Sequence, residues 1–284
     1  MMPIRMSAVR AGALRGAIEF RNSLQKPADL LYYLIGAVSF SAALWYFRDD
    51  IVPQLGVSTS AIIFPSALAL MTLLVATYGL ATLVSTERED GTVLRLAILP
   101  AGTFTYAWGQ TVRTLLELAF TFGLFTTLAS IFVPELWIRG AVGMFTALGF
   151  LLLGILACLP LGFVVGSIFS NPRSVGGWGF LVVAAIVWVS GIFVPLAAMP
   201  QWAQIVAQIL PLYWLGLGLR SALLPEGFAS IEMGESWRTL ETIGVLGLWA
   251  VVGAVLAPLL LQRIARKESF ASLATRREKA MQRV

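Results

Sequence analysis

GAVGMFTALGFLLLGILACLPLGFVVGSIFSNP, residues 140–172, contains no charged side chain. A helix that crosses the hydrocarbon core of a bilayer needs about 20 apolar residues, so this stretch is long enough to span a membrane. Five further charge-free stretches lie at 30–47, 51–86, 118–134, 174–219 and 242–262. The whole chain has 58% hydrophobic and 12% charged residues, whereas soluble domains have about 25% charged residues. The sequence therefore predicts an all-α integral membrane protein.

Six membrane-spanning helices follow from these stretches. We expect them at 30–47, 61–84, 109–133, 140–169, 177–196 and 242–262. The stretch 174–219 is too long for one crossing, since a helix rises about 1.5 Å per residue. Pro195, Pro200 and Pro211 interrupt it. We therefore predict a span followed by an outer re-entrant helical hairpin over 200–224.

Basic residues concentrate at both ends of the chain, and Lys and Arg favour the cytoplasmic side of a membrane. Segment 1–28 and the tail 263–284 are both rich in Arg and Lys. Both termini are therefore expected in the cytoplasm, which requires an even number of spans, as six is. The net charge of +5 follows from this topology and gives no reason to expect nucleic-acid binding.

The N-terminal segment 1–28 mixes apolar residues and arginines at roughly helical spacing. An amphipathic helix in the inner headgroup layer suits this mixture, and a disordered basic arm is the alternative. The first apolar run starts too late for a cleaved signal peptide. We expect a cytoplasmic interfacial helix in contact with membrane lipid.

The residue inventory excludes several kinds of chemistry. The chain has no histidine, which removes Ser–His catalysis and His-ligated metals. Its single cysteine, Cys158, cannot form an intrachain disulfide or a Cys metal cluster. None of the three lysines is followed by Ser or Thr, as a phosphate-binding P-loop requires. We expect no catalytic, metal or cofactor site, so that any ATP hydrolysis belongs to another polypeptide.

A charged segment, Thr86-Glu87-Arg88-Glu89-Asp90-Gly91-Thr92, separates the second and third spans on the cytoplasmic side. Thr86 and Glu89 have the spacing of a capping box, which predicts a short helix over 87–99. Gly91 inside that helix would cost about 1 kcal/mol relative to Ala, for which close approach of a partner's backbone would compensate. A solvated loop with a capped helix end is the alternative to partner docking.

Two motifs resemble those of a known family. The run from Glu87 to Thr92, with Leu96 and Pro100, is similar to the signature in the first cytoplasmic loop of ABC transporter permeases of the type-2 export class. A second stretch is similar to the segment before the last span of these permeases, especially the daunorubicin-resistance type. It consists of Phe193-Val194-Pro195, Met199-Pro200-x-Trp202, Leu210-Pro211-Leu212-Tyr213 and Arg220. The resemblance covers essentially the whole chain, with the motifs in the same order.

The resemblance implies a half-transporter in the plasma membrane of a prokaryote. Such a permease pairs with a second copy or a related permease and docks a separate ATPase subunit, which binds ATP and Mg²⁺. It implies a coupling helix at 87–99, with docking contacts from Glu87, Arg88, Glu89, Gly91 and Thr92. It also implies an outer hairpin that contains Pro200, Trp202, Pro211, Tyr213 and Arg220. The family exports drugs, lipids, glycans and other amphipathic cargo, among which the sequence does not select.

Two charged residues lie within the predicted third span. Arg113 and Glu117 are four residues apart on one helix face and can form an ion pair. This pair would mark a polar point on the cargo route or at the dimer seam, or else lie near the inner interface, with Arg113 snorkelling to water. The same ambiguity applies to Arg220, which would anchor the hairpin at the headgroups.

Two other functions compete with that of an ABC permease. An ion-gradient-driven secondary transporter usually has internal repeats, broken helices and ionisable residues near the membrane midplane. This chain has no evident repeat and one candidate acid in a span, Glu117. A membrane-embedded lipid enzyme would find almost no catalytic residues here, because the chain lacks histidine and has no acid pair within its spans.

Overall fold

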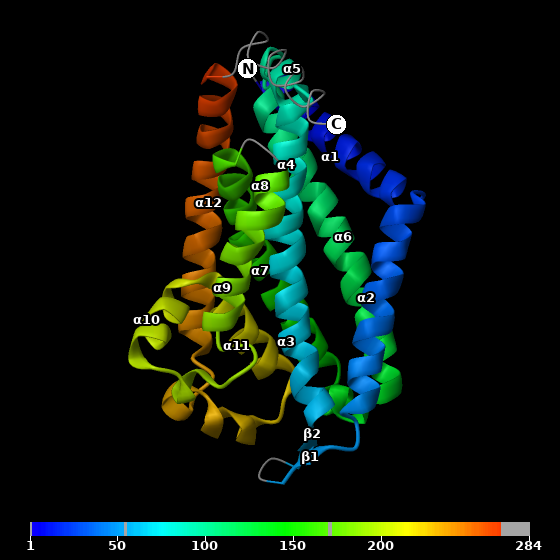
Figure 1. Ribbon diagram of the computed structural model, residues 1–284, viewed down its shortest axis with the longest axis vertical. Coiled ribbons are helices and arrows are strands. Elements are labelled where there is room, and N and C mark those ends of the chain that lie inside the picture. Colours follow the sequence, from blue (N-terminus) through cyan, green and yellow to red (C-terminus); the bar gives the residue numbers. More distant parts are fainter. Residues whose placement is uncertain (1, 54–55, 170–171, 268–284) are drawn as a thin grey trace.

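A computed structural model describes residues 2–53, 56–169 and 172–267 (Figure 1). Within these residues, six helical segments are long and apolar enough to cross a membrane. They are α2 (Pro27–Tyr46), the continuous run Thr59–Glu89, α6 (Gly102–Phe132), α7 (Gly140–Ile168), the run Pro172–Val189, and Thr239–Ala257 within α12 (Thr239–Lys267). The prediction of an all-α integral membrane protein with six spans is confirmed. Of the predicted tail, residues 268–284 lie outside the described residues.

The second span is one long helix with an unusual middle. It consists of α3 (Thr59–Leu73), a π-helical segment η1 (Leu74–Gly79) and α4 (Leu80–Glu89). The predicted capping box at Thr86 is wrong, because the Thr86 hydroxyl donates to the Thr82 carbonyl oxygen at 2.9 Å. Thr86 thus lies in the last turns of α4, and the charged residues extend this helix beyond the predicted end at 84.

Gly91 ends α4 and separates it from the next helix. Its φ of 75° lies in the left-handed region, which glycine adopts readily at helix C-termini. The short helix α5 (Thr92–Ala97) follows, before α6 begins at Gly102. The single helix predicted over 87–99 is therefore two helices that meet at Gly91. Gly91 is outside both, so the helix-interior cost assigned to it from the sequence does not arise.

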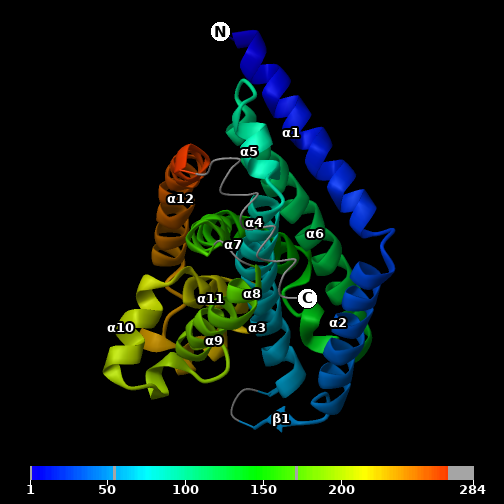
Figure 2. The ribbon, with the colours of Figure 1, turned by 45° about the horizontal axis from the view of Figure 1, so that its top comes forward.

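The first helix, α1 (Met2–Ser23), lies along the N-terminal half of α6, as Figure 2 shows. Its contact face is a buried stripe of small residues, Ala8, Gly12 and Gly16. A Cβ atom at Gly16 would lie 2.3 Å from the carbonyl oxygen of Gly109 in α6. Small residues at such spacing let two helix backbones approach closely. Helix α1 therefore packs closely against α6 through small residues.

We expect the substitution Gly16→Leu to loosen α1 from α6, because the new side chain would overlap the backbone at Gly109. Faster trypsin cleavage within residues 2–23, compared with the unsubstituted protein, would show the loosening. Gly36→Leu is the matched control, since a Cβ there meets nothing within 4 Å. Equal cleavage of both variants would contradict the close packing.

Helix α7 forms the centre of the molecule and packs against α4, α11 and α12. Glycines on α7 create the close contacts: a Cβ at Gly162 would lie 2.5 Å from the Ala76 carbonyl oxygen in η1. The Thr77 hydroxyl donates to the carbonyl oxygen of Cys158 at 3.1 Å, next to this contact. The π-helical part of the second span is thereby packed directly on the central helix.

The fifth span differs from its prediction at its C-terminal end. It consists of α8 (Pro172–Ser174), η3 (Val175–Gly179) and α9 (Phe180–Val189). The predicted range 177–196 runs too far, because Gly191 adopts a φ of 72° and turns the chain directly after the helix. A short 3-10 turn, η4 (Leu196–Ala198), follows.

The predicted outer hairpin corresponds to two helices, α10 (Gln201–Ile209) and α11 (Pro211–Leu223), which meet at an angle of 85°. Almost every residue of α11 is buried, since this helix packs against α3, α7 and α12. Helix α10 lies outside it with Trp202 and Ile209 exposed. Shorter elements complete the same end: β1 (Ile51–Val52), β2 (Val57–Ser58), η2 (Pro134–Trp137), η5 (Glu226–Ile231) and η6 (Met233–Glu235).

Candidate transport and docking sites

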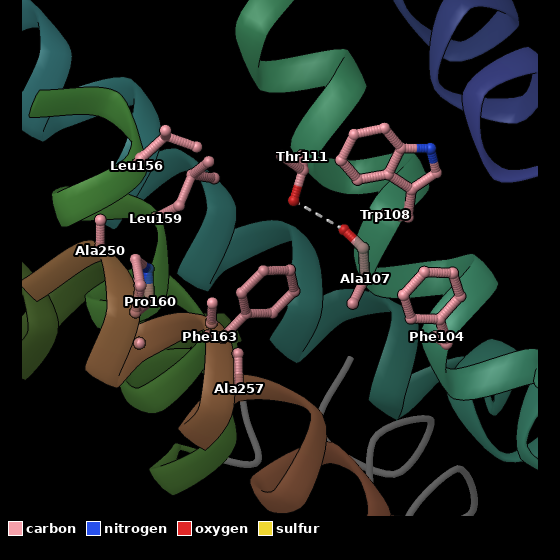
Figure 3. A pocket seen from close by; sticks show the side chains of 12 residues that line it. Phe104, Ala107, Trp108, Thr111, Leu156, Leu159, Pro160, Phe163, Ala250 and Ala257 are labelled. Atoms are coloured by element: carbon pink, nitrogen blue, oxygen red, sulfur yellow. Dashed lines mark hydrogen bonds between the residues drawn. The ribbon is translucent and has the colours of Figure 1, made fainter. Parts of the chain in front are cut away.

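An apolar cavity of about 220 Å³ lies between α6, α7 and α12 (Figure 3). The rings of Phe104, Trp108 and Phe163 line it opposite small residues of α12. The Thr111 hydroxyl donates to the Ala107 carbonyl oxygen at 2.9 Å within its own helix. The cavity therefore suits hydrocarbon.

A polar cavity of about 390 Å³ lies between α2, η1, α4 and α6. Its lining combines Asp29, Arg113 and Glu117 with Gln110, Thr114, Tyr32 and Tyr78, and with the apolar Leu74, Val75, Leu80 and Leu83. A neighbouring cavity of about 210 Å³ shares Asp29, Leu83 and Arg113 with it and adds Glu19, Asn22, Ser23, Lys26 and Glu87. Together the two cavities run from the end of α1 to the middle of α6.

The predicted ion pair between Arg113 and Glu117 is not formed. Glu117 instead accepts a hydrogen bond from the hydroxyl of Tyr33 in α2, at 3.0 Å. The Nε atom of Arg113 is buried and has no hydrogen-bond partner within the described part of the chain. Both charged groups line the polar cavity. Glu117 is thus tied by a hydrogen bond to α2 and not by an ion pair to Arg113.

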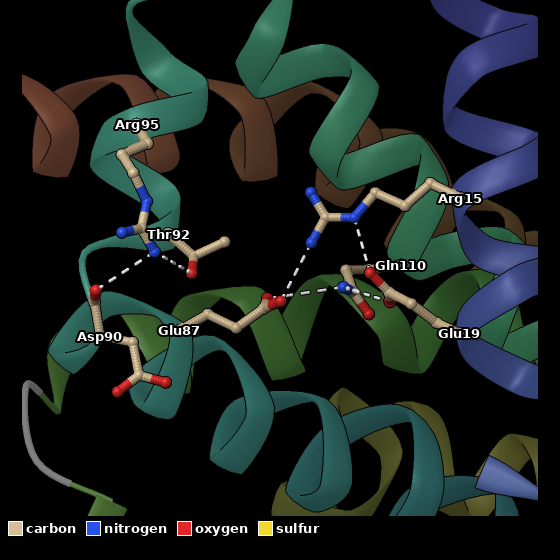
Figure 4. A network of polar contacts seen from close by, with 7 residues as sticks. All are labelled: Arg15, Glu19, Glu87, Asp90, Thr92, Arg95 and Gln110. Atoms are coloured by element: carbon tan, nitrogen blue, oxygen red, sulfur yellow. Dashed lines mark hydrogen bonds and ion pairs between the residues drawn. The ribbon is translucent and has the colours of Figure 1, made fainter. Parts of the chain in front are cut away.

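A network of polar side chains joins α1, α4 and α6 beside the charged loop, by which we mean residues 86–101 between the second and third spans (Figure 4). Arg15 of α1 forms ion pairs with Glu19, at 2.6 Å, and with Glu87 of α4, at 3.0 Å. Gln110 of α6, which is completely buried, donates from Nε2 to Glu19 at 3.0 Å and to Glu87 at 3.5 Å. The C-terminal end of α4 is thus held by two other helices.

Arg88 links the same end of α4 to the central helix. Its Nη1 atom donates to the carbonyl oxygens of Gly166 at 2.9 Å, Ser167 at 2.7 Å and Phe169 at 3.3 Å. These carbonyls are at the C-terminus of α7. The last carbonyl oxygens of a helix have no hydrogen-bond donor within the helix, and the helix dipole favours a cation there. Arg88 is only 6% exposed. Glu87 and Arg88, predicted as direct docking contacts, are therefore turned inward and position the segment.

The surface at the tip of this segment consists of other residues. Ile98 is 71% exposed and Leu99 is 54% exposed, directly after α5. Arg95 is also exposed and donates to the Thr92 hydroxyl at 3.1 Å. Of the predicted docking residues, Glu89 and Thr92 are half-buried and Gly91 is buried. The signal that could have indicated the tip is a pair of large apolar residues beside Pro100, at the end of a charged loop.

The hairpin formed by α10 and α11 is anchored by a buried ion pair. Arg220 Nε lies 2.6 Å from Glu232 Oε1, and the two side chains are 5% and 4% exposed. The prediction that Arg220 anchors the hairpin at lipid headgroups is wrong, because this arginine points into the protein. The reason is its acidic partner, which follows α11 in the irregular segment between η5 and η6.

The remaining predicted hairpin residues occupy distinct places. Pro200 precedes α10, and Pro211 is the first residue of α11. Trp202 is exposed and stacks on Trp188 with ring centroids 6.3 Å apart. Tyr213 is buried in the core, and its hydroxyl has no hydrogen-bond partner in the described structure.

Comparison with known proteins agrees with this architecture. No curated protein matches the chain, but the profile described as "ABC-2 family transporter protein" matches residues 49–259. The matched residues include the charged loop, the second to sixth spans, and helices α10 and α11. Within the described residues no cluster of acidic or Cys side chains could hold a metal ion. Proteins of this family are membrane subunits of ABC transporters that associate with an ABC ATPase subunit and dimerise. The chain is thus a multi-pass membrane transport subunit, and it belongs to the ABC-2 family of transporter permeases.

Proposed function

We propose that this chain is the membrane-spanning half of an ATP-driven exporter in the plasma membrane of a prokaryote. Two such halves, identical or related, dock separate nucleotide-binding subunits, on which ATP and Mg²⁺ bind. The cargo is hydrophobic or amphipathic and of the drug, lipid or glycan type, as in daunorubicin-resistance-like permeases. Both termini are cytoplasmic in this arrangement, which places the charged loop on the side of the ATPase.

The observation that carries the proposal is the construction of the charged loop. Its tip presents Ile98 and Leu99, whereas its base is fixed to α1, α6 and α7 through Glu87 and Arg88. An ATPase that grips the tip would therefore move several helices together. ATP binding would close the two ATPase subunits and push the two loops towards each other, and the membrane halves would shift to release cargo outward.

We expect the double substitution Ile98→Glu and Leu99→Glu to remove the ATPase from the permease, because two charges would replace the exposed apolar tip. The tagged chain is purified in mild detergent from its native membranes, and a co-purifying P-loop ATPase is identified by mass spectrometry. The expected loss is about tenfold or more, as when interface anchors are removed. Leu14→Glu, at an exposed apolar position on α1, is the control and should retain the ATPase. No ATPase with the unsubstituted, well-expressed dimer would overturn the proposal.

One observation favours the alternative of an ion-gradient-driven carrier, namely that Glu117 faces a cavity at the depth of a span. Ionisable residues in such places often belong to ion pathways. Efflux of a fluorescent amphipathic dye from cells separates the two functions. An exporter driven by ATP should continue after the proton gradient is collapsed while ATP is maintained, whereas the alternative predicts that efflux stops both then and in Glu117→Gln.

A further inference from the structure

We propose that the polar cavity between α2, η1, α4 and α6 binds the zwitterionic headgroup of an amphiphile, with a phosphate and a primary ammonium a few atoms apart. Phosphoethanolamine is the simplest headgroup of this kind. If the amphiphile is the transported cargo, that part of the inference rests on the proposed function. The binding site itself follows from the side chains that line the cavity.

Charged groups of both signs line this space without partners of their own. Arg113 and Asp29 face both cavities, and neither forms a hydrogen bond or ion pair through its side chain within the described residues. The Lys26 side chain, in the adjoining cavity, has no such contact either. Glu117 uses one carboxylate oxygen for Tyr33. Glu19 and Glu87, which line the adjoining cavity, are already paired with Arg15. The two adjoining cavities together therefore offer two cations, Arg113 and Lys26, and two carboxylates, Asp29 and Glu117, to a ligand.

This mixture of charges selects among ligand classes. A purely cationic amphiphile would leave the buried Nε–H of Arg113 without an acceptor, and unmet buried donors are costly. A purely anionic amphiphile would bring its charge beside Asp29 and Glu117 and be repelled. A phosphate satisfies the guanidinium, which is well shaped for phosphate oxygens, while an ammonium group satisfies the carboxylates. A zwitterion meets both requirements at once.

The lining also favours a primary ammonium over a methylated one. Carboxylates form strong, charge-assisted hydrogen bonds with N–H donors, which a trimethylammonium group lacks. The rings of Tyr32 and Tyr78 add faces that attract a cation whether or not it is methylated, so the preference for a primary ammonium comes from the carboxylates. Acyl chains would follow the apolar wall formed by Leu74, Val75, Leu80 and Leu83. The volume of about 390 Å³ lies in the range of small-molecule sites.

The position of the cavity agrees with a lipid headgroup as the source. Lys26 is exposed and directly precedes Pro27, where the first span begins. Asp29 lies in the first turn of that span. Basic residues at the ends of spans mark the headgroup level of a membrane. A lipid of the adjoining leaflet can therefore place its headgroup between α2 and α6 while its chains stay in the bilayer.

Native mass spectrometry of the purified full chain tests the inference. The protein is incubated with equimolar dioleoyl lipids bearing phosphoethanolamine, phosphocholine or phosphoglycerol, and retained lipid is counted. Phosphatidylethanolamine should be retained preferentially. Arg113→Gln should reduce its retention by about tenfold or more, as expected for loss of a charge-assisted hydrogen bond. Arg48→Gln, beyond the opposite end of α2, is the control and should not change it.

The order in which a variant prefers the lipids can be compared even if the variant is less stable than the native chain. Asp29→Asn combined with Glu117→Gln should shift preference to phosphatidylglycerol, because two positive groups remain. When a cationic dioleoyl lipid is added to the same mixture, Arg113→Gln should instead shift preference to that lipid. Misfolding would lower all lipids together and could not invert their order. Unchanged retention in all these variants, or no preference among lipids in the native chain, would overturn the inference.

Further measurements distinguish a lipid headgroup from free phosphoethanolamine as the ligand, and they test the binding site separately from the proposed exporter. Soluble phosphoethanolamine should compete with the lipid only weakly if the acyl chains contribute to binding, and full competition would overturn the lipid as ligand. Selective lipid binding without any co-purifying ATPase would leave this site standing and remove the proposed exporter. If an ATPase co-purifies but the chain shows no lipid preference, the proposed exporter stands and the proposed headgroup site is overturned.

Discussion

Arg220→Met is expected to lower the free energy of unfolding by about 3–5 kcal/mol, because it leaves the Glu232 carboxylate buried without its partner. The two groups lie 2.6 Å apart and are almost fully enclosed. They connect α11, which is buried in the core, to the segment that leads into α12. Thermal unfolding of the purified protein in detergent, with and without the substitution, measures the loss.

A second substitution distinguishes the cost of an unpaired charge from general damage. Arg220→Met combined with Glu232→Leu should recover most of the stability, since buried ion pairs can often be replaced by apolar residues of similar volume. Arg48→Met is the control, because its ion pair with Asp49 is exposed and worth about 0–1 kcal/mol. A double variant as unstable as the single one would contradict this explanation.

Arg88→Met is expected to cost about 3 kcal/mol or more and to uncouple the ATPase from transport. The substitution removes the donor to three carbonyl oxygens at the end of α7, and a buried group without a partner costs about 1–3 kcal/mol. It also releases the charged loop from the central helix. Unfolding of the purified chain gives the first effect, and ATP-dependent transport by the complex with its ATPase gives the second.

The neighbouring residue supplies the matched control for Arg88. Glu89→Gln changes a charge in the same turn of α4 without touching the contacts to α7, so its effect on stability should stay within about 0.5 kcal/mol. Arg88→Met with normal stability and normal coupling would show that the cap on α7 is unimportant. Normal stability with lost docking would instead return Arg88 to the direct contact role predicted from the sequence.

The six spans could be predicted because length and lack of charge are local properties of the chain. Errors arose at helix ends, where local signals compete. Thr86 and Glu89 have the spacing of a capping box, yet the Thr86 hydroxyl bonds back to Thr82, as Thr does inside helices. Gly91 and Gly191 also fall inside predicted helices, whereas in the structure each adopts a positive φ directly beyond a helix.

The side-chain partners could not be predicted, since they come from distant parts of the chain. Arg113 and Glu117 have the spacing of a helical ion pair, but the hydrogen-bond partner of Glu117 is Tyr33 on another helix. Arg88 is a docking residue by resemblance, yet it finds carbonyls at 166–169. Sequence spacing describes only neighbours on one helix. The sites of this protein are built between helices, which pack in ways that spacing does not reveal.

The π-helical turns at 74–79 determine where the length of the second span is a constraint in its own right. A residue added to or removed from a regular α-helix turns everything beyond it by about 100°, whereas a π-turn takes up one extra residue within itself and leaves the helix beyond it in register. A chain with one residue fewer at 74–79 could therefore close into a regular α-helix and keep the directions of Glu87 and Arg88. Loss of a residue from 80–86 would instead swing Glu87 away from Gln110 and Arg88 away from the end of α7. Related chains should therefore keep the number of residues at 80–86 constant and keep small side chains at the buried positions 76 and 77, which pack on α7.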